Sequence, residues 1–519
     1  MKELQNKIRT GLYDLLKDQF PIECAEIEFS IPPKREFGDI STTLPFVLAK
    51  KMKEKPFLIG KKIVELLDGC FDFVEVIKLA NGGFINFYLN KTYFLTHVYQ
   101  NRNQEIEATG KKVIVEHTSI NPNKSAHIGH LRNSCLGDSL ISALKYCGNS
   151  VEIQNYLDDT GIQVADVVWG VLYHEKKSLE EIKDIEDIAS YLWNLYTEVH
   201  KLPEEESIEA GKKAVHQKIE DKINPEYEMS DYISKSVTKN HIDVMNRLGI
   251  RYDLLIRESD IIELDFFTEA AELLKKTGIM YLSEDPAKEN CWVIKYRKEN
   301  IEKIIIRSNG TITYIGKDIA YTLWKTGYFK KDFYYKPFYS YPDSKAIYIS
   351  DDRESDLPKN TQASYGSADM VYNVIDTRQA YLQNLIAQIL SDLSDKTEVR
   401  NFSHFSYEMV ALTQNCVNEM GFEISDDQKQ KSYIEVSGRK GIAIKADELI
   451  DRLKQKSLVE VEKRNQGADP EEIDHIAEEI AIGALRYFMI KYNSNSVIAF
   501  DFDEVLSFEG DTGPYLQYT

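Results

Sequence analysis

The sequence predicts an α/β protein built around a parallel sheet, and three stretches support this prediction. Residues 113–115 form a short apolar run that is typical of a buried parallel strand. A polar loop follows, and from Leu131 apolar residues recur at helical spacing towards Gly148, a suitable helix stop. Residues 151–156 and 370–375 are further strand-like runs, each followed by polar residues. In open α/β sheets, ligands bind at the carboxyl ends of the strands, so we expect the site there.

The composition is that of a soluble globular protein with several domains. The chain has 519 residues, of which 43% are hydrophobic and 29% charged. No apolar run approaches membrane-spanning length, and the first residues do not resemble a signal peptide. The six cysteines include no C-x-x-C pair, so we expect reduced thiols and a cytoplasmic protein. The net charge of −20 argues mildly against a nucleic-acid partner, although a local basic groove can coexist with an acidic exterior.

The polar loop after residues 113–115 is a candidate phosphate-binding site. A helix start offers free backbone N–H groups and the positive end of the helix dipole. Gly129 has no Cβ, so a flat ring or a phosphate can approach the backbone closely there. His127 and His130 can both donate to phosphate oxygens, and Lys124 adds a fixed charge. These residues therefore predict binding of a phosphorylated ligand.

A metal ion or two solvated histidines are the alternatives for the same loop. A metal site needs further His, Cys or Asp residues at ligand spacing. Asp158 and Asp159 are the only nearby candidates in the sequence. We therefore predict no protein-bound metal.

Residues 127–130, His-Ile-Gly-His, match in full the HIGH motif of class I aminoacyl-tRNA synthetases. The flanking sequence from 115 to 133 resembles arginyl-tRNA synthetases in particular. Residues 435–441, Glu-Val-Ser-Gly-Arg-Lys-Gly, are similar to the KMSKS signature but lack its usual first Lys and Met. The resemblance implies that Lys124, just before the HIGH motif, supplies part of the missing charge.

The resemblance implies a Rossmann-type catalytic domain at 109–458 with two insertions. We expect the insertion at about 174–250 to be helical and solvated, and the insertion at about 328–368 to be a long loop or small insertion. Residues 459–519 turn helical and resemble the first part of the helical anticodon-binding domain of the family. We therefore expect that domain to be truncated here.

Residues 1–108 are expected to form a separate N-terminal α/β additional domain that contacts tRNA. Residues 73–89 predict a hairpin around Asn81-Gly82-Gly83. In the family, the segment that matches Phe37-Gly38-Asp39 helps to hold the tRNA elbow. A simple turn made by Gly38 and Asp39 explains the same segment equally well.

The resemblance implies an arginine–tRNA ligase, which adenylates L-arginine with ATP and passes it to the 2′-OH of the terminal adenosine of tRNA(Arg). Such a reaction needs no protein nucleophile, only positioning and electrostatic stabilisation, with Mg²⁺ accompanying the ATP phosphates. The expected catalytic residues are Lys124, His127, His130, Arg439 and Lys440. The expected ATP-binding residues are His127, Gly129, His130, Ser437, Arg439 and Lys440.

Arginine carries a planar guanidinium with five donors and a permanent charge, so a selective pocket needs carboxylate acceptors. Glu116 and Asp318 match family positions for that role, with Tyr314 beside them. Ser119, Asn121 and Gln379 match positions that hold the α-amino and carboxylate groups. Helix capping alone also explains Asp318.

Two other functions remain open from the sequence. One is a freestanding enzyme that adenylates arginine for another acceptor, and the other is a non-catalytic RNA-binding relative. Arginine-dependent exchange of pyrophosphate into ATP, with and without tRNA, separates the three. We expect a monomer that does not associate with membranes.

Overall fold

The computed structural model describes residues 2–518 except 33, 68, 102–105, 204, 330, 354–363, 395–400, 423, 425–430, 437–442 and 508. It divides into two compact units, residues 1–106 and 107–519. The division lies two residues before the predicted end of the N-terminal domain at 108. Within the described residues, no helix is long and apolar enough to cross a membrane.

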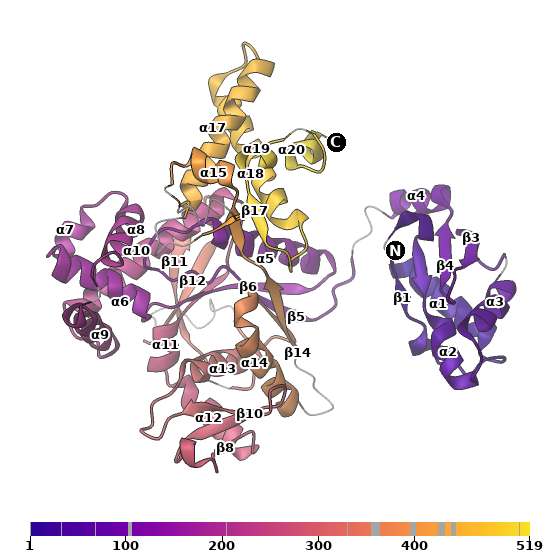
Figure 1. Cartoon of the computed structure of the whole chain (residues 1–519), viewed down its shortest axis with the longest axis horizontal. Helices are drawn as coiled ribbons and strands as arrows, with labels where there is room; N and C mark the ends of the chain where they lie inside the picture. Colours follow the sequence, from indigo (N-terminus) through magenta and orange to yellow (C-terminus); the bar gives the residue numbers. More distant parts are fainter. Residues whose placement is uncertain are drawn as a thin grey trace. The chain divides into compact units, whose positions relative to one another are not determined.

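The N-terminal unit is a four-stranded antiparallel sheet covered by helices (Figure 1). Its strands, in sheet order, are β1 (Phe29–Ser30), β2 (Ile40–Thr42), β4 (Ile85–Leu89) and β3 (Val74–Leu79). Its helices are α1 (Lys2–Leu16), α2 (Leu44–Met52), α3 (Pro56–Leu66) and α4 (Lys91–Gln100). In α1, Leu4, Ile8 and Leu12 recur every fourth position and are fully buried, which explains why this helix faces the core. The predicted hairpin of β3 and β4 is confirmed.

The second unit is organised around a seven-stranded sheet, in which the edge strand β11 is antiparallel to β12 and the other neighbouring strands are parallel to one another. In sheet order the strands are β11 (Tyr334–Ser340), β12 (Ala346–Asp351), β7 (Leu254–Arg257), β6 (Ser150–Leu157), β5 (Lys112–Glu116), β13 (Met370–Asp376) and β14 (Asn401–Tyr407). The three predicted strands are confirmed as β5, β6 and β13. Because β6 and β13 pair with opposite sides of β5, the chain changes direction across the sheet at β5. Such a switch point is where open α/β sheets bind ligands.

Helix α5 (Ile128–Tyr146) follows β5 and packs into the largest hydrophobic core. Its apolar stripe is confirmed, because Leu131, Leu136 and Ile141 are buried in that core. The helix begins three residues earlier than Leu131, within the HIGH motif itself. The motif therefore forms the first turn of the helix rather than the loop before it.

The expectation of a loop or small insertion at 328–368 is wrong, because residues 334–351 form β11 and β12 of the central sheet. Pro337 suggests a loop, but it lies in the edge strand β11, where a missing ladder N–H is tolerated. The register also shifts between Pro337 and Tyr339, which interrupts the simple alternation of buried and exposed residues. Ile347 and Ile349 of β12 nevertheless point into the core.

The first insertion is helical, as predicted, and it has a hydrophobic core of its own. Its helices are α6 (Ile162–Trp169), α7 (Leu179–Lys183), α8 (Ile188–Val199), α9 (Glu206–Glu220) and α10 (Glu226–Arg247), which lie together beside the sheet in Figure 1. After β7 come α11 (Glu258–Glu263), α12 (Phe266–Lys276), a small sheet of β8 (Met280–Leu282), β9 (Trp292–Tyr296) and β10 (Ile301–Ile306), and α13 (Tyr314–Lys325). Helix α14 (Ala380–Leu393) follows β13.

The last part of the chain continues the core of the second unit. It contains α15 (Gln414–Glu419), α17 (Ala446–Arg464), α18 (Pro470–Lys491), α19 (Phe502–Val505), α20 (Gly513–Tyr518) and a small sheet of β15 (Val410–Leu412), β16 (Ile434–Glu435) and β17 (Ile498–Phe500). Leu453 of α17 and Phe488 of α18 lie in the same core as α5. The predicted boundary at 458/459 falls inside α17, where the helix is continuous.

Candidate active site

The turn after β5 is strained at two consecutive residues. Thr118 and Ser119 have φ angles of +74° and +43°, in the left-handed region that non-glycine residues rarely adopt. The Thr118 N–H donates to Asn133 Oδ1 at 2.5 Å, and the Ser119 N–H donates to Asn155 Oδ1 at 2.9 Å. Such a conformation costs on the order of 1–3 kcal/mol per residue and persists only where the surroundings fix it. The turn includes Ser119 and lies between Glu116 and Asn121. The backbone that carries these three predicted site residues is therefore fixed.

The side chain of Thr118 anchors this turn in the interior. Its hydroxyl lies 2.7 Å from the Tyr252 hydroxyl, 2.8 Å from Ser134 Oγ and 2.9 Å from His117 Nδ1. All four residues are buried. A buried polar network of this kind rigidifies the backbone that it holds.

His127 and His130 form the start of α5 and stack on each other, with ring centroids 3.7 Å apart. His127 Nδ1 accepts from the Gly129 N–H at 3.1 Å, and His130 Nδ1 accepts from the His127 N–H at 3.1 Å. Because both Nδ1 atoms accept, each neutral ring carries its proton on Nε2 and offers one donor. Burial, followed by the charge of Lys124, lowers the pKa of His127 to about 3. Burial also lowers the pKa of His130 well below its usual value, so both rings are neutral near pH 7.

Gly129 is required by the His127 ring itself. A Cβ at this position would lie 2.9 Å from a ring carbon of His127. We predicted that a ligand approaches the backbone closely at Gly129. In the structure, the imidazole of His127 approaches the backbone there. The absence of a side chain lets the ring fold over the first turn of α5 and accept its N–H group.

Lys124 is buried beside the histidines, with 9% of its surface exposed. Its Nζ lies 4.2 Å from the centroid of the Tyr196 ring of α8. Its carbonyl oxygen accepts from His241 Nε2 of α10 at 2.8 Å. The helical insertion therefore holds this lysine through both its backbone and its side chain.

The predicted Ser437, Arg439 and Lys440 lie outside the described residues. The segment that follows them is fixed against the HIGH motif. The Ile128 N–H donates to the Ile444 carbonyl at 3.1 Å, and the Ala446 N–H donates to the Ala126 carbonyl at 2.9 Å. His127 and Lys445 form an antiparallel bridge between these bonds. Backbone hydrogen bonds therefore join the HIGH motif to the segment that follows the second signature.

A group of carboxylates lies at the same edge of the sheet. Glu116, the last residue of β5, forms an ion pair with the fully buried Lys325 of α13. Lys325 also donates to Asn373 Oδ1 of β13 at 3.1 Å. This lysine therefore ties the end of β5 to the middle of β13, its neighbour at the switch point.

Asp318 belongs to this carboxylate group and is not a helix cap. Helix α13 begins at Tyr314 with Thr313 at the N-cap, so Asp318 lies in its second turn. Burial, followed by the charges of Glu258 and Glu116, raises the pKa of Asp318 to about 7. The mutual repulsion shows that the three carboxylates face one shared region.

Glu258 also belongs to this carboxylate group, and our sequence analysis missed it. It is the first residue of α11, directly after β7, and its carboxylate accepts from the Tyr156 hydroxyl at 2.8 Å. It also forms an ion pair with Lys317. Burial, followed by the charge of Glu258, raises the pKa of Asp158 to about 7, so this carboxylate belongs to the same region. The rule that ligands bind at the carboxyl ends of parallel strands could have identified Glu258, because it directly follows β7.

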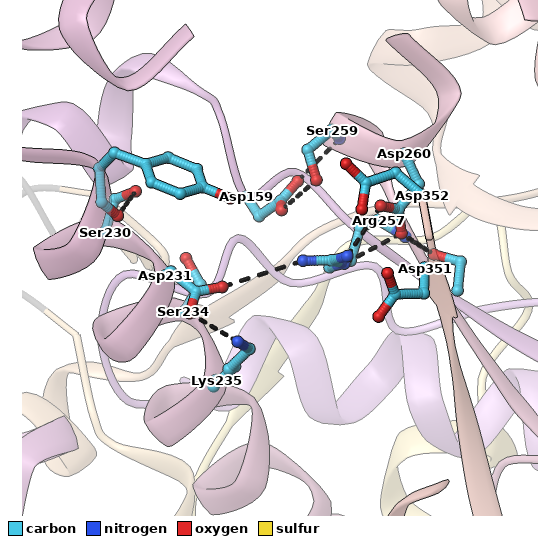
Figure 2. A network of polar contacts seen from close by, with 12 residues as sticks. Asp159, Ser230, Asp231, Ser234, Lys235, Arg257, Ser259, Asp260, Asp351 and Asp352 are labelled. Carbon is cyan, nitrogen blue, oxygen red and sulfur yellow. Dashed lines mark hydrogen bonds and ion pairs between the residues drawn. The ribbon is translucent and has the colours of Figure 1, made fainter. Parts of the chain in front are cut away.

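A polar network holds the ends of β6 and β7 together (Figure 2). Asp159 accepts from the Ser259 N–H at 3.0 Å and from the Ser259 hydroxyl at 2.6 Å. Arg257 donates to both carboxylate oxygens of Asp260, at 3.0 and 2.7 Å. Glu258 lies between these two anchored positions in the sequence. The network therefore fixes the start of α11, and with it the backbone of Glu258.

The remaining predicted residues lie around this region. Ser119 and Asn121 follow β5 and are partly buried, and Gln379 is exposed in the short turn after β13. Tyr314 is the first residue of α13, and its side chain lies outside what the structure describes. Among the described residues, no group of three or more His, Cys, Asp or Glu side chains is arranged to hold a metal ion.

The charges at this edge suit two different ligands side by side. Four carboxylates, Glu116, Asp158, Glu258 and Asp318, lie together with Lys317 and Lys325, and this excess of negative charge favours a cation. The start of α5 offers neutral imidazole donors and a buried ammonium, which favour phosphate oxygens.

Comparison with known proteins agrees with this arrangement. The family model described as "tRNA synthetases class I (R), catalytic domain" matches residues 94–336, and "Arginyl tRNA synthetase N terminal domain" matches residues 2–89. The arginine–tRNA ligase of Thermococcus sibiricus is 34% identical over 98% of this chain and 79% of its own length. That of Deinococcus radiodurans is 30% identical over 94% of this chain and 75% of its own length.

Solved structures give the same result. The arginyl-tRNA synthetase of Thermus thermophilus has a TM-score of 0.79 and 28% identity, over 99% of this chain and 80% of that chain. The enzyme of Plasmodium falciparum, at 18% identity and a TM-score of 0.68, shares the fold. The match at both levels, over nearly the whole length, shows that this chain belongs to the family of arginyl-tRNA synthetases, which are class I aminoacyl-tRNA ligases.

Proposed function

We propose that this chain activates L-arginine with ATP and transfers it to the 2′-OH of the terminal adenosine of tRNA(Arg). The observation that supports this proposal is the juxtaposition of a phosphate-type site and a carboxylate pocket at one switch point. The arginine carboxylate would attack the α-phosphorus of ATP, and pyrophosphate would leave. Bringing these groups together supplies much of the rate by positioning.

The phosphate side of the site would use neutral donors and one fixed charge. The Nε2–H groups of His127 and His130 would bind phosphate oxygens as negative charge develops on them, and Lys124 would add its ammonium. Ser437, Arg439 and Lys440 would act from the second signature. Mg²⁺, bound with ATP, would neutralise part of the phosphate charge.

The arginine side would use the carboxylates that are not paired with the fully buried Lys325. Asp318 and Glu258 would face the guanidinium, because its fork of donors matches two acceptors. Glu116 is already paired with Lys325 and would contribute its second oxygen. Ser119, Asn121 and Gln379 would hold the α-amino and carboxylate groups, and Tyr314 would lie beside the guanidinium.

The N-terminal unit would contribute a contact to tRNA. It has a cavity of about 440 Å³ whose lining includes Phe37, Phe84 and Asn86. Phe37 is 43% exposed, whereas Gly38, with a φ angle of +100°, packs against the Phe87 carbonyl. Gly38 thus shapes the turn, and the exposed ring at the cavity suits stacking with an unpaired base.

We further propose that the chain works as a monomer in the cytoplasm. All six cysteines lie among the described residues and none of them forms a disulfide; three are buried and three are exposed. Exposed reduced thiols suit a reducing compartment.

The experiment that tests the proposal is arginine-dependent exchange of pyrophosphate into ATP, with and without tRNA, followed by charging of tRNA(Arg). Exchange and charging together support the proposed reaction. Exchange without charging points to another acceptor for the arginyl group. Absence of both, in protein that binds tRNA, points to a non-catalytic RNA-binding relative.

A further inference from the structure

One face of α8 runs along the HIGH motif and the segment that follows the second signature. Residues 190, 193 and 196 are spaced so that they lie on the same side of the helix. Their contacts are Ser190 Oγ with Lys445 Nζ at 3.0 Å, the Trp193 ring edge-on to His127 at 6.5 Å, and the Tyr196 ring with Lys124 Nζ at 4.2 Å. The helical insertion, which carries no signature of its own, thus contacts the HIGH motif, the lysine before it and the segment that follows the second signature.

Tyr196 makes the contact that bears most directly on charge. It is 2% exposed, and Lys124 is 9% exposed, so their contact is largely shielded from water. A cation over an aromatic face is stabilised by the ring's quadrupole, and more strongly when both are desolvated. The nearest imidazoles add no positive charge, because burial lowers the pKa of His241 to about 4 and that of His127 to about 3.

We propose that Tyr196 is a positioning residue for Lys124: its ring holds the ammonium in the orientation that meets the phosphates of ATP. This inference rests on the proposed function. The hydrogen bond from His241 to the Lys124 carbonyl fixes the backbone. At the end of the flexible four-carbon stem, the ammonium contacts the Tyr196 ring and also donates to Asn123 Oδ1 at 3.4 Å. A lysine that is aligned in advance loses less entropy when it binds the phosphates.

Packing alone is the competing explanation for Tyr196. The ring lies in the core of the helical insertion, together with Leu192 and Val199. A large-to-small substitution would therefore disturb the insertion whether or not the lysine contact matters. The decisive change must alter the electrostatics of the ring and keep its shape.

Replacement of Tyr196 by phenylalanine and by fluorinated phenylalanines changes the electrostatics of the ring in this way. Tyr196→Phe retains the ring face, and incorporation of 4-fluoro- and 3,4,5-trifluorophenylalanine withdraws electron density stepwise at nearly constant size. We expect kcat of arginine-dependent pyrophosphate exchange to stay near the wild-type value with Phe. It should then fall progressively, by about tenfold in total, which corresponds to about 1.4 kcal/mol. The same series in a Lys124→Met background should be flat.

Tyr191 provides a matched control on the same helix. Its ring lies 4.5 Å from Lys177 Nζ, away from the signature segments, so the same fluorinated series there should leave kcat unchanged. A flat series at position 196, or an equal slope in the Lys124→Met background, would overturn the inference.

Calorimetric titration with ATP separates this inference from the proposed function. If the wild-type chain exchanges no pyrophosphate, the proposed function fails. If ATP affinity falls along the fluorinated series, and this trend disappears in the Lys124→Met background, the contact of Tyr196 with Lys124 is still supported. If both ATP affinity and pyrophosphate exchange are equal across the series, the inference about Tyr196 is refuted.

Discussion

His127 and His130 illustrate how a local environment changes the chemistry that a motif suggests. Both imidazoles are drawn into the start of α5 and accept backbone N–H groups through Nδ1. They act there as neutral donors through Nε2, and the fixed positive charge comes from Lys124. The proposed phosphate site therefore does not depend on protonation of a histidine near pH 7.

For His130→Ala, we expect kcat for adenylate formation to fall on the order of a hundredfold or more, with a smaller rise in KM for ATP. Loss of one donor to a developing negative charge typically costs about 3 kcal/mol. Stopped-flow or exchange kinetics at saturating arginine would measure the change. Turnover like that of the wild type would remove His130 from the catalytic residues.

Asp318 should give the proposed arginine pocket a pH dependence. Its pKa is raised to about 7, so the carboxylate gains its charge as pH rises from 6 to 8, and arginine binding should strengthen over that range. Asp158 titrates in the same range and should add to the effect. We expect KM for arginine to fall with rising pH while KM for ATP changes little.

The matched variant is Asp318→Asn, which keeps the shape and removes the charge. It should weaken arginine recognition by about 2–5 kcal/mol. It should also reduce the pH dependence of KM for arginine to the part that Asp158 contributes. An unchanged KM for arginine at pH 8 would exclude Asp318 from the pocket.

At the level of elements, the hydrogen bonds between Asp159 and Ser259 join the ends of β6 and β7. We expect Ser259→Ala to destabilise the fold by about 1–3 kcal/mol, because it leaves a buried carboxylate oxygen without its donor. The shift of α11 should also raise KM for arginine but not KM for ATP. Denaturant unfolding and exchange kinetics would measure the two effects.

Thr268→Ala is the control for Ser259→Ala. It removes a hydroxyl–carboxylate bond of similar length, 2.7 Å to Asp265, at an exposed position of α12. The exposed bond should contribute little to the free energy of unfolding. Equal losses for the two variants would show that burial of Asp159 does not matter.

The elements that sequence reasoning found are those whose pattern depends on local spacing alone. The apolar runs of β5, β6 and β13 and the stripe of α5 are of this kind. The strand β11 was missed because the tolerance of Pro337 depends on its place at the sheet edge, which the spacing of residues does not reveal.

The site residues could be predicted only where the surrounding sequence matches a known motif. Glu258 was missed because the sequence around it carries no motif. Its importance becomes visible only in the fold, which brings Tyr156 and Asp318 close to it. The neutral state of His127 likewise follows from burial, which the motif alone does not show.

At the scale of the whole molecule, residues 1–106 form a compact unit with a core separate from that of residues 107–519. We expect an isolated fragment of residues 1–106 to fold and to unfold cooperatively, since its buried side chains contact one another. Circular dichroism and thermal melting of the fragment would measure this. A disordered fragment would show that the N-terminal unit depends on the rest of the chain.

The bridge between His127 and Lys445 has a consequence for synthesis on the ribosome. The two residues are 318 positions apart in the sequence, and translation at about 5–20 residues per second needs about 15 to 60 s to pass from one to the other. During that interval the nascent chain holds a complete HIGH motif without the segment that braces it. The N-terminal unit can fold early in this period, whereas catalytic competence must wait until Lys445 has left the exit tunnel.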